Sequence, residues 1–180
     1  HAGKRWFDRM VLSAPMIALA QVRSTGLIRP LAAALSLAGM GGSTVPGGST
    51  APVALKPFEG NPVTSDPVRY ARTAAYAEAD ARLGLGAPTV GWLREALAVT
   101  RRFSHPLYTR GIRQPMLLVG AARDPLIDTP RIEEFARRLK TGGAVVIPGS
   151  RHEPLQERDE IRAQFWAAFD AFIPGEQAFL

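Results

Sequence analysis

Three short stretches of the chain contain a continuous apolar run, and they fall near its two ends. They are Asp8–Ala14, which is built on Met10, Val11 and Leu12, Met116–Val119 and Ala144–Ile147. Each is closed by proline or glycine, which end regular structure. Continuous apolar runs of this length are typical of parallel strands that are covered on both faces. The pattern predicts a parallel sheet with one strand near the start of the chain and two near its end.

Apolar residues recur at helical spacing around the two late strands. Residues 129–139 carry Pro130 at the first helical position and Thr129 as the expected cap, and Gly142-Gly143 is expected to end this helix. Residues 159–172 carry one apolar stripe, which predicts a closing helix. The order strand, helix, strand, helix indicates the α/β class.

The middle of the chain contains no convincing strand. Helices are predicted over residues 31–38, 67–83 and 91–103, the second of them capped by Asp66. Residues 39–52 are rich in glycine, serine, threonine and proline, which favours a mobile loop. A mostly helical block of this size between two strands of one sheet indicates an insertion.

These patterns divide the chain into three parts. Residues 1–15 and 111–180 are expected to form the sheet and the helices that cover it. Residues 16–110 are expected to form a helical cap inserted over the carboxyl ends of the strands.

The composition is that of a globular protein, and it excludes several kinds of site. Hydrophobic residues make up 46% of the 180 residues, and no apolar run reaches the roughly 18 residues that span a bilayer. The chain has no cysteine, which excludes disulfides, thiolate metal sites and cysteine nucleophiles. Its three histidines lack the spacing of metal ligands, so we expect neither a metal nor a cofactor.

The net charge is +6, from 22 lysine and arginine residues against 16 aspartate and glutamate residues. The basic residues are scattered, without the clusters and interleaved aromatic residues of a nucleic-acid surface. We therefore expect no nucleic-acid partner, and peripheral contact with an anionic membrane surface is left open. The expected location is the cytoplasm, with the inner membrane surface as the alternative. The sequence does not indicate an oligomeric state.

Three polar residues follow the predicted strands: Ser13, Asp124 and His152. Parallel sheets bind ligands outside the carboxyl ends of their strands. A carboxylate and a histidine can meet there, and the carboxylate then accepts the imidazole N–H and stabilises the imidazolium. Taken singly, Asp124 is explained as well by a turn and His152 by an exposed loop. Their order on consecutive strands favours a catalytic pair.

Five segments, which cover most of the chain outside residues 39–52, carry a family resemblance. They are FDRMVLSAPMI (7–17), NPVTSDPVRYAR (61–72), GAPTVGWLREAL (86–97), QPMLLVGAARDPLIDT (114–129) and VVIPGSRHEPLQERDEIRAQFWAAFDAFI (145–173). They resemble the C-terminal part of an α/β-hydrolase of the lysophospholipase and monoacylglycerol-lipase type, grouped with the serine aminopeptidase-like hydrolases. The resemblance implies that Asp124 is the acid and His152 the base of a Ser-Asp-His triad.

The chain departs from the pattern of this family in one respect. Such hydrolases carry the nucleophilic serine in a Gly-x-Ser-x-Gly turn between a strand and a helix. The sequences around Ser43 and Ser49 lack the last glycine, and neither follows a predicted strand. The chain also opens at His1 rather than at a methionine. We therefore expect a longer parent protein with the nucleophile and oxyanion donors upstream, and no activity of this chain alone.

The leading functional hypothesis is hydrolysis of carboxylic esters of small lipid-like substrates by the parent protein, through an acyl-enzyme. Trp92, Leu93 and Leu97 are candidates to line an acyl pocket, with packing of the cap onto the core as the alternative. A second hypothesis is a proline-iminopeptidase-like aminopeptidase, which needs acidic cap residues to hold a free amine. The candidates are Glu59, Asp66, Glu78, Asp80 and Glu95. A third is a catalytically silent remnant or binding domain.

Overall fold

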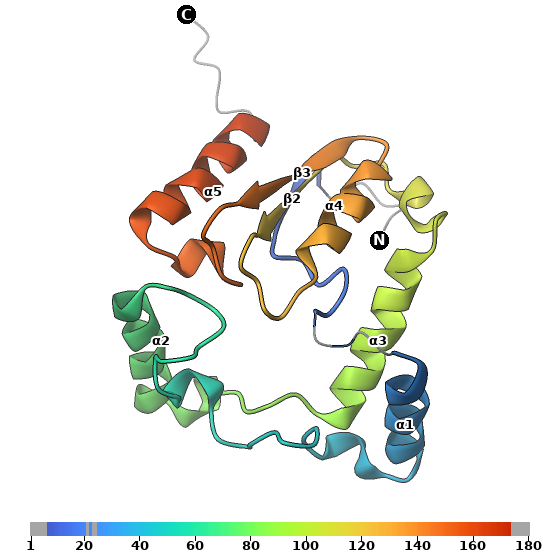
Figure 1. Cartoon of the computed structure of the whole chain (residues 1–180), viewed down its shortest axis with the longest axis vertical. Coiled ribbons are helices and arrows are strands. Elements are labelled where there is room, and N and C mark those ends of the chain that lie inside the picture. Colours follow the sequence, from blue (N-terminus) through green and yellow to red (C-terminus); the bar gives the residue numbers. More distant parts are fainter. Residues whose placement is uncertain (1–6, 21, 23–24, 174–180) are drawn as a thin grey trace, which may run out of the picture. The chain divides into compact units, whose positions relative to one another are not determined.

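A computed structural model describes residues 7–20, 22 and 25–173 of the chain (Figure 1). The described chain divides into two compact units. The sheet unit comprises the described parts of His1–Gln21, Pro62–Ser65 and Phe103–Leu180, and the helical unit those of Val22–Asn61 and Asp66–Arg102. The helical unit is shorter than the predicted insertion of 16–110, because the described residues of 16–21, Pro62–Ser65 and residues 103–110 belong to the sheet unit. Its role as a cap stays a prediction.

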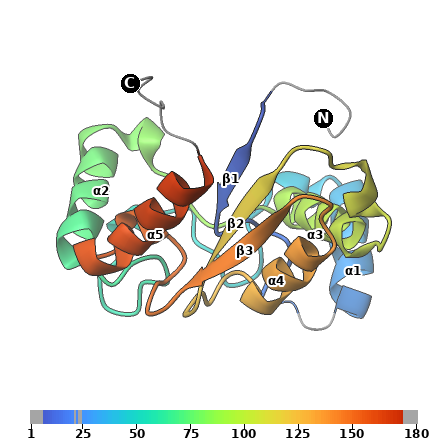
Figure 2. The same cartoon turned by 90° about the horizontal axis from the view of Figure 1, so that it is seen from above.

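The sheet unit is built on three parallel strands. They are β1 (Met10–Ser13), β2 (Met116–Ala121) and β3 (Gly142–Ile147). β2 lies between the other two (Figure 2), with Ser13 paired to Val119 and Ala121 paired to Ile147. The carboxyl ends of the strands therefore lie at one edge, and the predicted parallel sheet is confirmed.

Two helices cover the two faces of this sheet, α4 (Thr129–Arg137) on one face and α5 (Asp159–Phe172) on the other (Figure 1, Figure 2). Successive side chains of β2 alternate between them. Leu118 belongs to the core cluster that includes α4, and Val119 to the cluster that includes α5. Every residue of β2 is buried, which explains why its sequence is continuously apolar.

Gly142 and Gly143 begin β3, so the prediction that they end the preceding helix is wrong. α4 already ends at Arg137. Gly142 pairs with Met116 at a φ of 128°, and a Cβ atom at this position would collide with the Met116 backbone. Glycine is required by this close approach of two strands, and not by the end of a helix.

Two other expectations about element ends are also corrected. The predicted strand Met116–Val119 does not end at the glycine that follows it, Gly120, because β2 continues to Ala121. Thr129 does not cap α4, because its hydroxyl donates to the Ala121 carbonyl at 2.7 Å. The Asp128 carboxylate caps this helix and accepts the N–H of Arg131.

The helical unit contains α1, α2 and most of α3. Their bounds are Thr25–Leu37, Pro67–Ala79 and Val90–Ser104. Asp66 caps α2 as predicted, because its carboxylate accepts the N–H groups of Val68 and Arg69. α2 is shorter than predicted, and a separate 3₁₀ turn follows at Ala81–Leu83. Within the described ranges, no helix is long and apolar enough to cross a membrane.

The glycine-rich segment 39–52 runs beside residues 85–90. Backbone hydrogen bonds join Val45 to Pro88, Ala87 to Ser49, and Val90 to Ser43. A Cβ atom at Gly48 would lie 2.7 Å from the Cβ atom of Ala87, and one at Gly86 2.7 Å from the Thr50 carbonyl. Glycine therefore serves the close approach of two chain segments here. The predicted mobility of the loop stays a prediction.

Candidate active site

Asp124 and His152 meet at the carboxyl edge of the sheet. Asp124 lies in the turn after β2, and His152 lies in the loop between β3 and α5. The His152 Nδ1 atom is 2.8 Å from the Asp124 Oδ2 atom. The Asp124 side chain is 0% exposed and that of His152 is 25% exposed. The structure therefore brings together the two residues that the sequence singled out as a pair.

The Asp124 carboxylate is held by hydrogen bonds to both of its oxygens. Oδ1 accepts the backbone N–H groups of Leu126 at 2.8 Å and Ile127 at 3.0 Å, while Oδ2 faces His152. Burial opposes ionisation of this carboxyl group. The hydrogen bonds from His152 and from the backbone outweigh burial and hold the pKa of Asp124 below its ordinary value. Asp124 is therefore a fixed anion.

The hydrogen bond to Asp124 raises the pKa of His152 above its ordinary value, although partial burial of the ring acts in the opposite direction. It also fixes the tautomer, because a carboxylate can only accept, and the proton of the neutral imidazole then sits on Nδ1. The other ring nitrogen, Nε2, has no hydrogen-bond partner in the described parts of the chain. Its lone pair is free to take a proton.

The two loops that carry this pair are joined by their backbones. The Ala122 N–H donates to the Ile147 carbonyl at 3.1 Å, and the Arg123 N–H donates to the Ser150 carbonyl at 2.9 Å. Ser150 is fully buried. These bonds extend the pairing of β2 with β3 beyond the strands, so that Asp124 and His152 are placed by neighbouring segments of one sheet.

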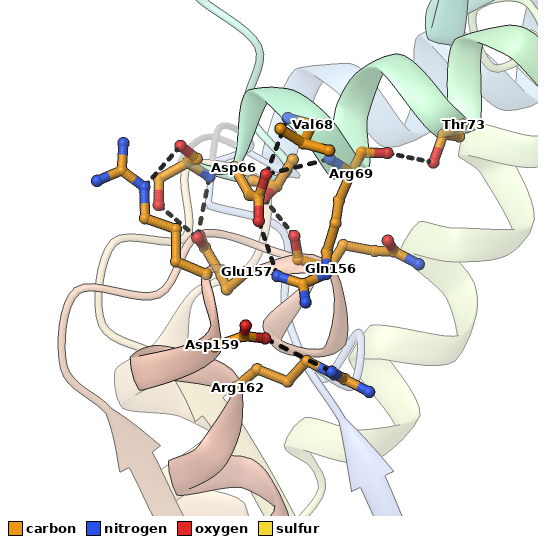
Figure 3. Close-up of polar contacts among 11 residues, drawn as sticks. Asp66, Val68, Arg69, Thr73, Gln156, Glu157, Asp159 and Arg162 are labelled. Atoms are coloured by element: carbon orange, nitrogen blue, oxygen red, sulfur yellow. Dashed lines mark hydrogen bonds and ion pairs between the residues drawn. The ribbon is translucent and has the colours of Figure 1, made fainter.

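A buried polar cluster holds the His152 loop from its other side, and the sequence did not single it out. The Glu157 carboxylate, with no exposed surface, accepts the N–H of Arg151 at 2.8 Å. It also accepts the N–H of Ser65 at 3.0 Å, and Figure 3 shows the Glu157 side chain among its polar neighbours. Thr64 is also buried, and its hydroxyl donates to the Gln156 carbonyl at 2.6 Å. A glutamate beside a helix start is ordinarily exposed, so the sequence alone carried no signal of this burial.

Other residues considered from the sequence lie apart from this pair. Ser13 ends β1 at the same edge, but no hydrogen bond joins it to Asp124 or His152 in the described structure. His105 is exposed, and its Nδ1 atom accepts the Leu107 N–H. Among the described residues, no cluster of three or more histidine, aspartate or glutamate side chains is arranged to hold a metal ion.

The candidate acyl-pocket residues all lie on α3 in the helical unit. Leu97 is buried, which fits the packing alternative, whereas Trp92 is about half exposed. Leu93 is half-buried. Their role in binding substrate stays a prediction. Ser49 has a local role, since its hydroxyl oxygen accepts the Ala51 N–H.

Comparison with known proteins identifies relatives of this chain. A family model described as "Serine aminopeptidase, S33" matches residues 1–159. A curated protein from Haemophilus influenzae, named a probable lysophospholipase L2, is 25% identical over 91 residues. This alignment covers 51% of the present chain and 28% of the Haemophilus protein.

Solved structures share the fold at low sequence identity. A soluble variant of monoglyceride lipase from Saccharomyces cerevisiae, in complex with a substrate analog, matches 90% of this chain with a TM-score of 0.66 and 14% identity. A thermostable carboxyl esterase from Bacillus coagulans, in complex with glycerol, matches 95% with a TM-score of 0.65 and 16% identity. A monoacylglycerol lipase from Paleococcus ferrophilus matches 91% with a TM-score of 0.56 and 16% identity.

The present chain is shorter than the proteins it resembles. It covers 54%, 58% and 59% of the lengths of these three solved structures. The structural matches show an α/β-hydrolase fold, and the parallel sheet with helices on both faces agrees with it. Because the family model spans most of the sequence, the chain belongs to the serine aminopeptidase S33 family of α/β-hydrolases, with relatives of the lysophospholipase and monoacylglycerol-lipase type.

Proposed function

We propose that this chain supplies the acid and the base of a Ser-Asp-His triad in an enzyme that hydrolyses carboxylic esters of lipid-like substrates. The observation that carries the proposal is the 2.8 Å contact between His152 Nδ1 and Asp124 Oδ2. It leaves the Nε2 lone pair free, as a general base requires, and it places a buried anion where the imidazolium forms.

In this mechanism the nucleophilic serine hydroxyl gives its proton to Nε2 of His152 as its oxygen attacks the ester carbonyl carbon. Asp124 stays ionised and stabilises the imidazolium. The carbon–oxygen bond to the alcohol then breaks, and His152 returns the proton to the leaving oxygen. Water attacks the acyl-enzyme in the same way, with His152 again taking and returning one proton, and releases the carboxylic acid.

The nucleophile is the part of the triad that this sequence does not provide in a recognisable form. Neither Ser43 nor Ser49 stands in a Gly-x-Ser-x-Gly turn, and both lie in the segment beside residues 85–90 of the helical unit. We propose that the serine and the oxyanion donors lie upstream in the full-length protein. This chain alone is then expected to be inactive.

Three of the five candidate acidic residues of the helical unit form ion pairs, which favours an ester over a free amine as the recognised group. Asp66 pairs with Arg69, Asp80 pairs with Arg82, and Glu95 pairs with Arg94. An aminopeptidase needs carboxylates that converge on one free amine. These three are instead engaged by neighbours on their own segments. The printed names of the relatives, which are lipases, a lysophospholipase and an esterase, support the same choice.

The test is to express this chain with its upstream coding sequence and to assay three substrate classes: monoacylglycerols, lysophospholipids and aminoacyl p-nitroanilides. We expect ester hydrolysis that His152→Ala abolishes and that His105→Ala leaves intact. Release of p-nitroaniline without ester hydrolysis would assign the aminopeptidase activity instead. Activity of the 180-residue chain that Ser43→Ala or Ser49→Ala removes would contradict the proposed upstream nucleophile.

A further inference from the structure

Glu157 is a buried carboxylate outside the proposed triad. It follows the 3₁₀ turn Pro154–Gln156 and precedes α5, and none of its surface is exposed. A charged group is costly to bury, and well-packed apolar side chains of similar size often give greater stability. The contacts of Glu157 therefore indicate what its charge is used for.

The Glu157 carboxylate bridges two segments that are distant in sequence. Oε1 accepts the Arg151 N–H at 2.8 Å. Oε2 accepts both the N–H and the hydroxyl of Ser65, a residue 92 positions away in sequence (Figure 3). One side chain thus joins the residue that precedes His152 to the segment 62–65.

The segment 62–65 also forms a hydrogen bond with Glu153, the residue that follows His152. The Glu153 N–H donates to the Val63 carbonyl at 2.9 Å. The Arg151 guanidinium donates to the Thr64 carbonyl at 3.0 Å. The backbone is therefore fixed on both sides of His152, by Glu157 through Arg151 and by Val63 through Glu153, while the imidazole reaches Asp124.

A carboxylate at position 157 can accept hydrogen bonds at both oxygens, from Arg151 at one and from Ser65 at the other. Glutamine at position 157 has the same shape but offers a single acceptor oxygen. Its NH₂ group would face either the Arg151 N–H or the Ser65 donors, and two donors cannot satisfy each other. An unpaired buried donor is unfavourable, so the His152 loop or the segment 62–65 would have to move.

We propose that Glu157 is a positioning residue, which clamps the backbone on both sides of His152 through Arg151 and the segment 62–65 and so sets the imidazole against Asp124. Its effect on catalysis rests on the function proposed above. Its effect on the geometry of His152 does not, because that geometry is present in this chain without any substrate.

The decisive experiment is NMR spectroscopy of the His152 imidazole in the 180-residue chain. In Glu157→Gln we expect faster exchange of the Nδ1 proton and a pKa of His152 lower than in the wild type, because the contact with Asp124 is lost in part of the population. The matched control is Glu160→Gln, an exposed glutamate on α5, which should leave both signals unchanged.

An unchanged His152 signal in a folded Glu157→Gln variant would overturn the proposal. Circular dichroism establishes that the variant is folded. If Glu157→Gln does not fold, Ser65→Ala decides the question, because it removes a hydroxyl donor to Glu157 and keeps the backbone N–H. A smaller change of the His152 signal in the same direction is expected, and no change would overturn the proposal.

Kinetics of the full-length enzyme provide the second measurement. Misplacement of a catalytic group by about 1 Å lowers the rate by about 10²-fold, so we expect Glu157→Gln to lower kcat on that scale with little change in KM. Glu160→Gln should have no effect. If the full-length protein hydrolyses no ester, the proposed function fails, yet the NMR comparison still tests the positioning role. An unchanged kcat in Glu157→Gln would overturn the catalytic consequence.

Discussion

The sheet unit and the helical unit are stabilised by different interactions. The largest fully buried side chains, Leu118, Ile132 and Ile147 among them, belong to the sheet unit. In the helical unit the buried residues include several alanines, whereas long apolar side chains such as Leu37 and Leu85 are largely exposed. Its helices instead have local polar contacts such as the Asp66 cap. Asp124 and His152 therefore lie in the unit that buries the larger side chains.

The largest expected effect concerns the pair itself. In the full-length enzyme, Asp124→Asn should lower kcat by about 10⁴-fold with the fold retained, because the wrong tautomer of His152 is then favoured. Asp128→Asn is the control, since Asp128 caps α4 beside the same loop. Steady-state kinetics on a short-chain ester measure both. An equally severe Asp128→Asn would show that Asp124 is not the triad acid.

The next largest effect compares how much a leucine in each unit contributes to the free energy of unfolding. Leu118→Ala deletes a fully buried side chain of β2 and should lower the free energy of unfolding by about 2–5 kcal/mol. Leu37→Ala, at the exposed end of α1, should change it by no more than about 0.5 kcal/mol. Urea denaturation of the 180-residue chain measures both. Equal effects would mean that Leu37 is covered by other residues in solution.

A smaller effect tests the local stabilisation of the helical unit. Asp66→Ala removes the cap of α2 and the ion pair with Arg69, and should cost about 1 kcal/mol. Hydrogen exchange should locate the loss in residues 67–79 and leave the amides of β2 and β3 protected. Uniform loss of protection in both units would show that they unfold as one.

The smallest expected effect is the dependence of the free energy of unfolding on pH, which comes from the contact between Asp124 and the partly exposed His152. The raised pKa of His152 stabilises the fold fully below its ordinary value of 6.5, and this contribution is lost as the pH rises through the folded pKa. The lowered pKa of Asp124 stabilises the fold above its ordinary value of 3.8, and is lost as the pH falls through the folded pKa.

The stability difference between wild type and Asp124→Asn should therefore be largest between pH 3.8 and 6.5. Urea denaturation at a series of pH values measures it. A difference that does not vary with pH would show that the contact between Asp124 and His152 is not formed in solution.

The pairing of Asp124 with His152 could be predicted from the sequence because both follow strands of one parallel sheet, whose carboxyl ends meet at one edge. Gly142 was misassigned, because a glycine that ends a helix and one that admits a neighbouring strand look alike before the register is known. The burial of Glu157 was missed for a related reason. The burial of Glu157 depends on Ser65, which is 92 residues away, and a local sequence pattern does not predict a contact between residues so far apart.

The sequence separations of the two contacts, Asp124 with His152 and Ser65 with Glu157, have a consequence for folding during synthesis. Asp124 and His152 are 28 residues apart, whereas Ser65 and Glu157 are 92 apart. For a flexible chain, closing the longer loop costs about 1 kcal/mol more in entropy. During synthesis the segment 62–65 also leaves the ribosome long before Glu157 does. The contact between Asp124 and His152 therefore closes the shorter loop, whereas the clamp on the His152 loop closes the longer one and can form only once Glu157 has been made.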